Sequence, residues 1–90
     1  MAWQIKFAAT ARKQLKKLDH QTQRNILQYL KNRIKTEENP RRYGGPLRDS
    51  LAGLWKYRIG DYRAICEIQE KEIVVLVLQV GHRRTVYGGH

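Results

Sequence analysis

The spacing of apolar residues changes along the chain, and each spacing predicts a different kind of element. Residues 3–7 alternate apolar and polar side chains as Trp-Gln-Ile-Lys-Phe, which is typical of a short strand. Two helices are expected next, the first from an N-cap at Thr10 to about Leu18, the second from an N-cap at Asp19 to about Glu37. The N-terminal half therefore predicts one strand followed by two helices.

The second predicted helix carries a single apolar stripe. Ile26, Leu27, Leu30 and Ile34 recur at three- and four-residue steps, which places them on one side of a helix. The Asn39-Pro40 pair ends the helix, because the residue before a proline avoids helical backbone angles. Both helices are thus expected to cover one face of a sheet.

Beyond residue 54 the apolar period becomes two. Residues 54–59 and 62–69 alternate, and Gly60-Asp61 between them has the composition of a two-residue hairpin turn. After a second turn at 70–72, residues 73–80 are almost all β-branched or leucine, which predicts a central strand buried on both faces. The segment 41–46, Arg-Arg-Tyr-Gly-Gly-Pro, is expected to be a loop.

These elements predict an α+β fold. Two N-terminal helices would pack on a curved, mainly antiparallel four-stranded sheet, in the chain order strand, helix, helix, strand, strand, strand. A chain of 90 residues supports one hydrophobic core, so we expect a single domain over residues 1–90.

Charge is the strongest feature of the composition. Eighteen Lys and Arg residues stand against eight Asp and Glu residues, a net charge of +10. Such an excess predicts a polyanionic partner, namely nucleic acid, a ribosome or an acidic protein, although a generally basic surface would give the same count. We expect a cytoplasmic protein without a membrane partner, because no secretory signal or span of ~20 apolar residues is recognisable. The single cysteine, Cys66, is interpreted as a small buried hydrophobe.

The predicted hairpin brings like charges together. If Gly60-Asp61 forms the turn, Arg58 lies opposite Arg63, and Lys56 lies on the same face, diagonal to Arg63. Like charges directly opposite each other destabilise a sheet, so a bound anion would explain the arrangement. The alternative is that the three side chains spread into solvent and repel each other little.

The C-terminal segment 81–87, Gly-His-Arg-Arg-Thr-Val-Tyr, is a second candidate site. It follows the last predicted strand and should lie at a sheet edge near the hairpin. Arg83 or Arg84 would add a cation, Tyr87 could stack on a base, and His82 and His90 are candidate proton carriers. The alternative is a basic tail with a tyrosine that packs on the sheet.

No set of residues has the spacing of metal ligands, so we expect no metal and no other cofactor. If the protein is a nuclease, it would have to work without a metal, and attack by the 2′-hydroxyl of the RNA itself can achieve this. That reaction needs a base for the hydroxyl, cations for the phosphorane and an acid for the leaving oxygen. Lysines and arginines suit the second need, while the identity of the base stays open, because arginine rarely gives up its proton.

The chain resembles the RelE branch of the RelE/ParE toxins over essentially its whole length. The resemblance is carried by Pro46-Leu47-Arg48, by residues 54–63 (Leu-Trp-Lys-Tyr-Arg-Ile-Gly-Asp-Tyr-Arg), by residues 77–83 (Val-Leu-Gln-Val-Gly-His-Arg) and by Val86-Tyr87. It implies a toxin of a type II toxin–antitoxin system that cleaves mRNA in the ribosomal A site without a metal. The implied partners are a cognate antitoxin, the 70S ribosome and mRNA.

The resemblance also implies roles for single residues. Lys56 and Arg58 match the basic pair of the second strand, and Arg63 matches an arginine that stabilises the transition state. Arg83 matches a proposed general acid, and Tyr87 matches a tyrosine that stacks on or orients the substrate. The remaining expected RNA or ribosome contacts are Arg48, His82 and Arg84. Arg58 stands where some members have lysine, which makes Lys56 the better candidate base.

Two other functions remain open at the level of the sequence. ParE toxins share the fold but inhibit DNA gyrase by binding, and they generally lack the full set of basic residues and tyrosine. A non-catalytic module that binds RNA or the ribosome would carry the same charge, and only turnover separates it from an enzyme.

Overall fold

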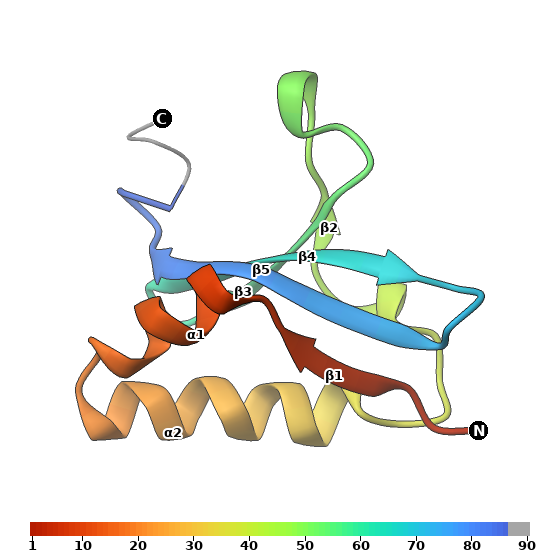
Figure 1. The fold of residues 1–90 in the computed structure, drawn as a ribbon, viewed down its shortest axis with the longest axis horizontal. Helices are drawn as coiled ribbons and strands as arrows, with labels where there is room; N and C mark the ends of the chain where they lie inside the picture. Colours follow the sequence, from red (N-terminus) through yellow and green to blue (C-terminus); the bar gives the residue numbers. More distant parts are fainter. Residues whose placement is uncertain (87–90) are drawn as a thin grey trace.

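The computed structural model describes residues 1–86, and its centre is a five-stranded sheet (Figure 1). The strands are β1 (Gln4–Phe7), β2 (Gly45–Pro46), β3 (Trp55–Ile59), β4 (Tyr62–Gln69) and β5 (Val74–His82). They lie in the order β1-β5-β4-β3-β2, with β1 parallel to β5 and the other neighbours antiparallel. The predicted α+β class is confirmed, while the expected number of four strands was one too few.

The extra strand, β2, arises from the segment that was expected to be a loop. Gly44 has a φ of +75°, and a Cβ atom there would collide with the carbonyl oxygen of Lys56. Glycine therefore lets the backbone approach β3 closely enough to pair Gly45 with Lys56 and Pro46 with Trp55. The Trp55 indole Nε1–H donates to the Tyr43 carbonyl at 2.7 Å and holds the segment in place.

Two helices precede these strands, α1 (Ala9–Lys16) and α2 (His20–Tyr29). Asp19 caps α2 as predicted, because its carboxylate accepts the Thr22 N–H at 3.2 Å. The predicted cap at Thr10 was wrong: Ala8 occupies the cap position of α1 and makes no side-chain bond there. The second helix was also predicted too long.

The end of the second helix is a π-helical turn, Leu30–Ile34, in which the Lys35 N–H donates to the Leu30 carbonyl at 2.9 Å. The chain then leaves the helical path, and the Thr36 N–H donates to the Ile34 carbonyl at 2.7 Å. The predicted end at Glu37 therefore lies three residues beyond the observed one. Short 3₁₀ turns follow at Pro40–Arg42 and Asp49–Leu51.

The hydrophobic core lies between the helices and one face of the sheet. Tyr57 of β3 is fully buried in this core, and Trp55 and Ile59 are partly buried and pack against it. Other buried side chains come from both layers: Ala11, Leu15, Ile26, Leu30, Ile34, Ala64, Cys66, Val75, Val77 and Val80. The stripe predicted on α2 is thus confirmed except for Leu27, which is exposed.

Strand β5 is central, as predicted, because it lies between β1 and β4. It begins at Val74, since Ile73 adopts a positive φ of 56° in the preceding turn. The expectation that it is buried on both faces was wrong at Gln79, which is exposed.

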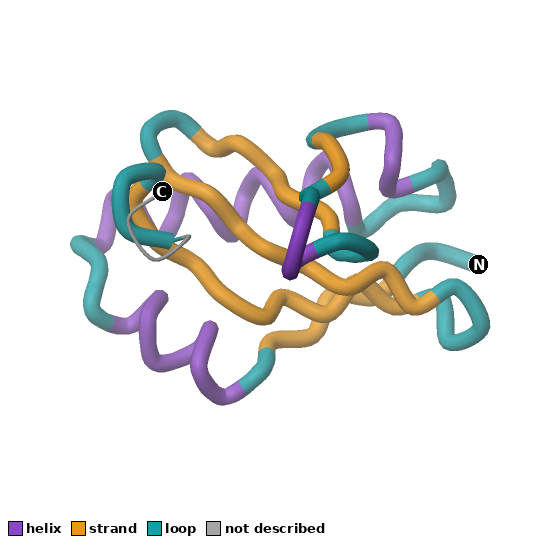
Figure 2. The backbone as a smooth tube through the Cα atoms, turned by 90° about the horizontal axis from the view of Figure 1, so that it is seen from above, coloured by secondary structure: helices purple, strands orange, loops and turns teal. Residues whose placement is uncertain are grey.

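The other face of the sheet, here called the open face, is turned away from α1 and α2. Figure 1 shows the helices below the sheet and the segment between β2 and β3 projecting above it. We call this segment, residues 47–54, the arm; its base is closed by a bond from the Leu47 N–H to the Leu54 carbonyl at 3.1 Å. Figure 2 looks down on the open face, with the arm in front, α2 behind the strands and α1 at the side of the sheet. No helix within residues 1–86 is long and apolar enough to span a bilayer.

Candidate functional site

The β3–β4 hairpin has the predicted register. Ile59 pairs with Tyr62, and Arg58 pairs with Arg63, so the two arginine side chains leave the same face of the sheet. Tyr57, between Lys56 and Arg58, points into the core. Lys56 and Arg58 therefore lie on the open face together with Arg63, and three cations share one patch.

Arg63 is nearly buried. The alternative of side chains that spread into solvent does not hold for Arg63, because only 8% of its surface is exposed. Its strand, β4, lies inside the sheet between β3 and β5. Its Nη1 donates to two backbone carbonyls, those of Gly60 at 3.1 Å and Tyr62 at 2.9 Å. These bonds offset part of the penalty for burying a cation, and no carboxylate pairs with Arg63 within residues 1–86.

The turn at Gly60-Asp61 holds two candidate residues at once. Gly60 has a φ of +62°, a conformation that suits glycine, and its carbonyl accepts from Arg63. The Asp61 carbonyl accepts the backbone N–H of Arg83 at 2.8 Å. The segment after β5 therefore lies against the hairpin, as predicted, and Arg63 and Arg83 are both fixed to one turn.

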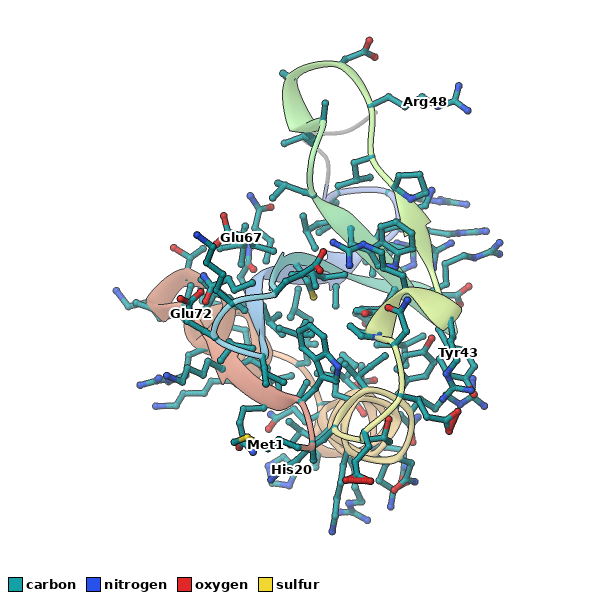
Figure 3. The ribbon with its side chains drawn as sticks, turned by 90° about the vertical axis from the view of Figure 1, so that its right-hand side faces the viewer. Met1, His20, Tyr43, Arg48, Glu67 and Glu72 are labelled. Atoms are coloured by element: carbon teal, nitrogen blue, oxygen red, sulfur yellow. The ribbon has the colours of Figure 1, made fainter. Side chains whose placement is uncertain are left out.

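The arm adds one cation, Arg48, above the open face. A pocket of about 500 Å³ lies between the arm and β3, and its lining includes Arg48, Ser50, Leu51 and Lys56. Arg48 is exposed on the arm, and Figure 3 shows it far from the helices. The lining thus combines Lys56 with one further cation, Arg48, and one carboxylate, Asp49, beside apolar surface from Leu47 and Leu51.

Three residues predicted to contact RNA or the ribosome either lie away from the cationic patch or fall outside the described residues. His82 pairs with Tyr62 in the sheet, and their rings meet edge to face at 5.5 Å between centroids. Because Tyr62 packs against the core, His82 lies on the helix-covered side of the sheet, not beside Arg63. Arg84 is exposed, and its N–H donates to His82 Nδ1 at 3.2 Å. Tyr87, like His90, lies outside the described residues.

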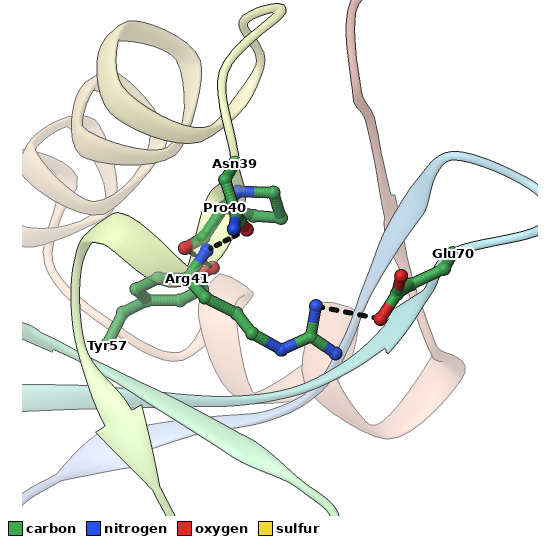
Figure 4. A network of polar contacts seen from close by, with 5 residues as sticks. All are labelled: Asn39, Pro40, Arg41, Tyr57 and Glu70. Carbon is green, nitrogen blue, oxygen red and sulfur yellow. Dashed lines mark hydrogen bonds and ion pairs between the residues drawn. The ribbon is translucent and has the colours of Figure 1, made fainter.

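Other titratable groups near the sheet serve the fold. Burial raises the pKa of the Cys66 thiol to about 12, which keeps it protonated, in line with its interpretation as a buried hydrophobe. Burial also raises the pKa of Tyr57, whose hydroxyl donates to the Pro40 carbonyl at 2.8 Å. Figure 4 shows this contact beside the ion pair of Arg41 with Glu70, at 2.9 Å. These contacts fix the segment that leads into β2.

The chemistry available at the open face is that of cations. Within residues 1–86, no group of three or more His, Cys, Asp and Glu side chains is placed to hold a metal ion. Lys56, Arg58 and Arg63 offer N–H donors to a phosphate from one face, and the Arg83 backbone is fixed beside them. Such an array can bind a phosphodiester and stabilise added negative charge on it.

Sequence reasoning missed the groups that hold the arginines. They are backbone carbonyls of the turn, which no side-chain pattern reveals, although the glycine at position 60 signals the turn itself. It also missed Gln79, which lies on the open face opposite Ile65. An isolated glutamine in an apolar strand was the available signal.

Comparison with known proteins identifies the class. The family model described as "ParE toxin of type II toxin-antitoxin system, parDE" matches residues 5–87. Two helices on a mostly antiparallel sheet are the features of the fold that the chain shares with a solved structure of this class. The chain belongs to the RelE/ParE superfamily of type II toxin–antitoxin toxins.

Within the superfamily its relatives are of the RelE type. Toxin RelG of Mycobacterium tuberculosis is 33% identical over 97% of this chain and 98% of its own length. A crystal structure of the toxin–antitoxin complex RelBE2 from the same organism matches with a TM-score of 0.81 and 31% identity, over 92% of this chain and 93% of that one. The intact E. coli RelBE complex, with a TM-score of 0.71 and 20% identity over 90% and 96% of the two chains, shares the fold.

Proposed function

We propose that this toxin is an endoribonuclease that cleaves mRNA in the ribosomal A site without a metal. The observation that carries the proposal is Arg63, a nearly buried arginine with no carboxylate partner among the described residues, directly opposite Arg58. A buried cation of this kind favours a site that is completed by an anion. A phosphodiester is the anion that the resemblance to RelE toxins implies.

The proposed reaction uses the RNA's own 2′-hydroxyl. Its oxygen forms a bond to the adjacent phosphorus while its proton passes to a base, for which Lys56 is our candidate. The bond from phosphorus to the 5′-oxygen breaks, and that oxygen takes a proton from an acid, for which Arg83 is our candidate. The products are a 2′,3′-cyclic phosphate and a free 5′-hydroxyl.

The other residues would bind and orient the message. Arg63 stabilises the charge that builds up on the phosphorane, because its position is fixed before the substrate arrives. Arg58 neutralises the same phosphate or its neighbour from the adjacent strand. Arg48 and Arg84 contact the RNA or ribosome from the arm and the C-terminal segment, and Tyr87 stacks on or orients the substrate. His82, on the other side of the sheet, contributes through the ribosome or not at all.

A cognate antitoxin is the second proposed partner. The related M. tuberculosis and E. coli toxins were each crystallised as toxin–antitoxin complexes. The net charge of +10 favours an acidic antitoxin segment over the open face. A complex that leaves Lys56, Arg58 and Arg63 accessible would show that neutralisation uses a different surface.

The test is cleavage mapping in a purified translation system. The protein is added to a defined message, with and without ribosomes stalled at a known codon, and RNA ends are located by primer extension. A cut within the A-site codon that needs the ribosome supports the proposal. An intact message with normal translation rejects it, and a parallel supercoiling assay then tests inhibition of DNA gyrase, the activity of ParE toxins.

A further inference from the structure

A polar groove lies beside the open face, between α2 and the end of β3. It has a volume of about 370 Å³. It exists because β2 pairs with β3 only at Lys56 and Trp55, so that within residues 1–86 the outer edge of β3 beyond Lys56 has no neighbouring strand. We call it the side groove and define it by six of its lining residues: Asn25, Gln28, Tyr29, Asn32, Arg33 and Arg58.

One wall of the side groove is a row of amides. Asn25, Gln28 and Asn32 follow each other at steps of three and four residues along the second helix, so they share one side of it. From first to last they span roughly 10 Å along the helix axis. The Asn25 oxygen already accepts a hydrogen bond from Gln21 Nε2 at 2.9 Å, which leaves its NH₂ group to donate. Gln28 and Asn32 can both donate and accept, which suits the edges of bases and ribose hydroxyls.

Two arginines provide the charge of the side groove. The Arg33 guanidinium lies 4.9 Å from the ring centre of Tyr29 and 5.4 Å from that of Tyr43, and this stacking limits its motion. Tyr43 lies on this flank of the molecule, near the helix (Figure 3). Within residues 1–86 neither Arg33 nor Arg58 forms an ion pair, and no carboxylate lines the groove.

Arg58 connects the side groove to the open face. It lines the groove, and its pairing with Arg63 places it in the cationic patch of the candidate site. A chain of phosphates on the open face could therefore continue past Arg58 into the groove without leaving cationic surface. A protein strand added to β3 would need apolar pockets for alternate side chains, whereas this wall is made of amides.

We propose that the side groove binds the nucleotides of the message that flank the cleaved bond. The proposal rests on the function proposed above and adds to it a defined path for the RNA strand: phosphates contact Arg58 and Arg33, and bases or riboses contact the amides. The groove thus extends the substrate site from the open face around the β3 edge to α2.

The test measures binding without cleavage, using 2′-O-methyl oligonucleotides, in which the attacking hydroxyl is blocked. Affinity is measured by fluorescence anisotropy for a short oligonucleotide and for one extended at both ends. We expect the extension to tighten binding to the unaltered protein by at least about fivefold. Gln28→Glu, which places a carboxylate in the groove, should remove most of this gain, and Arg33→Gln should lower the salt dependence of binding by about one counterion.

Gln4→Glu is the matched control, because it makes the same change of charge at an exposed position on β1, the opposite edge of the sheet. Asn32→Asp is the second groove variant if Gln28→Glu does not fold. Equal gains for the groove variants and the control would overturn the proposal. The proposal would also be overturned if the groove variants bound ribosomes or the antitoxin more weakly while extension of the oligonucleotide still raised its affinity as much as for the unaltered protein. Because no cleavage is scored, failure of the nuclease proposal would appear separately, in end mapping.

Discussion

Arg63 combines burial with a charge that no carboxylate in the described chain balances, and this makes it the residue with the sharpest expected phenotype. Arg63→Lys keeps the charge but cannot keep two carbonyl bonds and a fork of N–H donors toward a phosphate. We expect the rate of A-site cleavage to fall about 10²- to 10³-fold, as for loss of a fixed donor to a developing oxyanion. Single-turnover cleavage of a ribosome-held message measures it.

The control for Arg63 is Arg24→Lys, which makes the same substitution at an exposed position on α2. Arg63→Ala is a less clean variant than Arg63→Lys, because it leaves the Gly60 and Tyr62 carbonyls without this donor. We expect it to lower the free energy of unfolding by about 1–3 kcal/mol. Full activity of Arg63→Lys in a folded protein would exclude Arg63 from the reaction.

Burial of Cys66 makes the free energy of unfolding depend on pH in the alkaline range. Burial raises the thiol pKa from 9.0 to about 12, so the folded state favours the protonated form. Its stabilising contribution is complete below pH 9 and is lost as the pH rises toward 12. We expect the free energy of unfolding to fall with a limiting slope of about 1.4 kcal/mol per pH unit, and Cys66→Ala to flatten the profile. The difference between the unaltered protein and Cys66→Ala in urea titrations between pH 9 and 10 separates this thiol from Tyr57 and Tyr29, because burial raises the pKa of both tyrosines and their contribution is common to the two proteins.

At the scale of elements, the β3–β4 turn links the hairpin to the C-terminal segment. Gly60 and Gly53 both have positive φ values, +62° and +94°, and a Cβ atom added at either glycine would meet only open space. Alanine at either position should therefore destabilise the fold by about 1 kcal/mol through backbone strain alone. Only Gly60 belongs to the turn that binds Arg63 and Arg83.

We therefore expect Gly60→Ala to reduce cleavage well beyond its effect on stability, and Gly53→Ala to reduce cleavage no more than its stability loss explains. Gly60→Asn should restore much of the activity, because asparagine tolerates the left-handed conformation. Cleavage rates and urea denaturation of the three variants measure this. Equal losses of cleavage for the two alanine variants would show that the β3–β4 turn has no part in the reaction beyond its contribution to stability.

The helices and strands also show which features of the fold and of the candidate site could be predicted from the sequence. Period-two alternation and the Gly-Asp pair determined the hairpin register, and with it the juxtaposition of Arg58 and Arg63, since both are local properties. Strand β2 was missed because its pairing depends on a close approach at Gly44 between distant segments. The side of the sheet on which His82 lies, and the burial of Arg63, depend on pairing with β5 and its irregularity near Cys66. Such tertiary features have no local signal in the chain.

At the scale of the molecule, the charge of +10 and the basic open face predict strong dependence of binding on salt. Each phosphate contact releases counterions, so affinity for ribosomes should fall linearly on a log–log plot against salt concentration. Filter binding at several salt concentrations measures the slope. Lys56→Gln, on the open face, should make the slope shallower by about one, and Lys6→Gln, on the distant strand β1, should change it less. Binding insensitive to salt would contradict a phosphate interface.

In the proposed reaction, the substrate's own 2′-hydroxyl attacks the bond that is cut in the ribosomal A site. The most direct measurement compares two messages on ribosomes stalled at one codon, identical except for a single 2′-deoxyribose at the nucleotide before the mapped cut. We predict that the all-ribose message is cut in the A-site codon and that the deoxy message stays intact at that bond. Cleavage of both messages at this bond would exclude attack by the 2′-hydroxyl, and cleavage of neither would exclude the proposed nuclease activity.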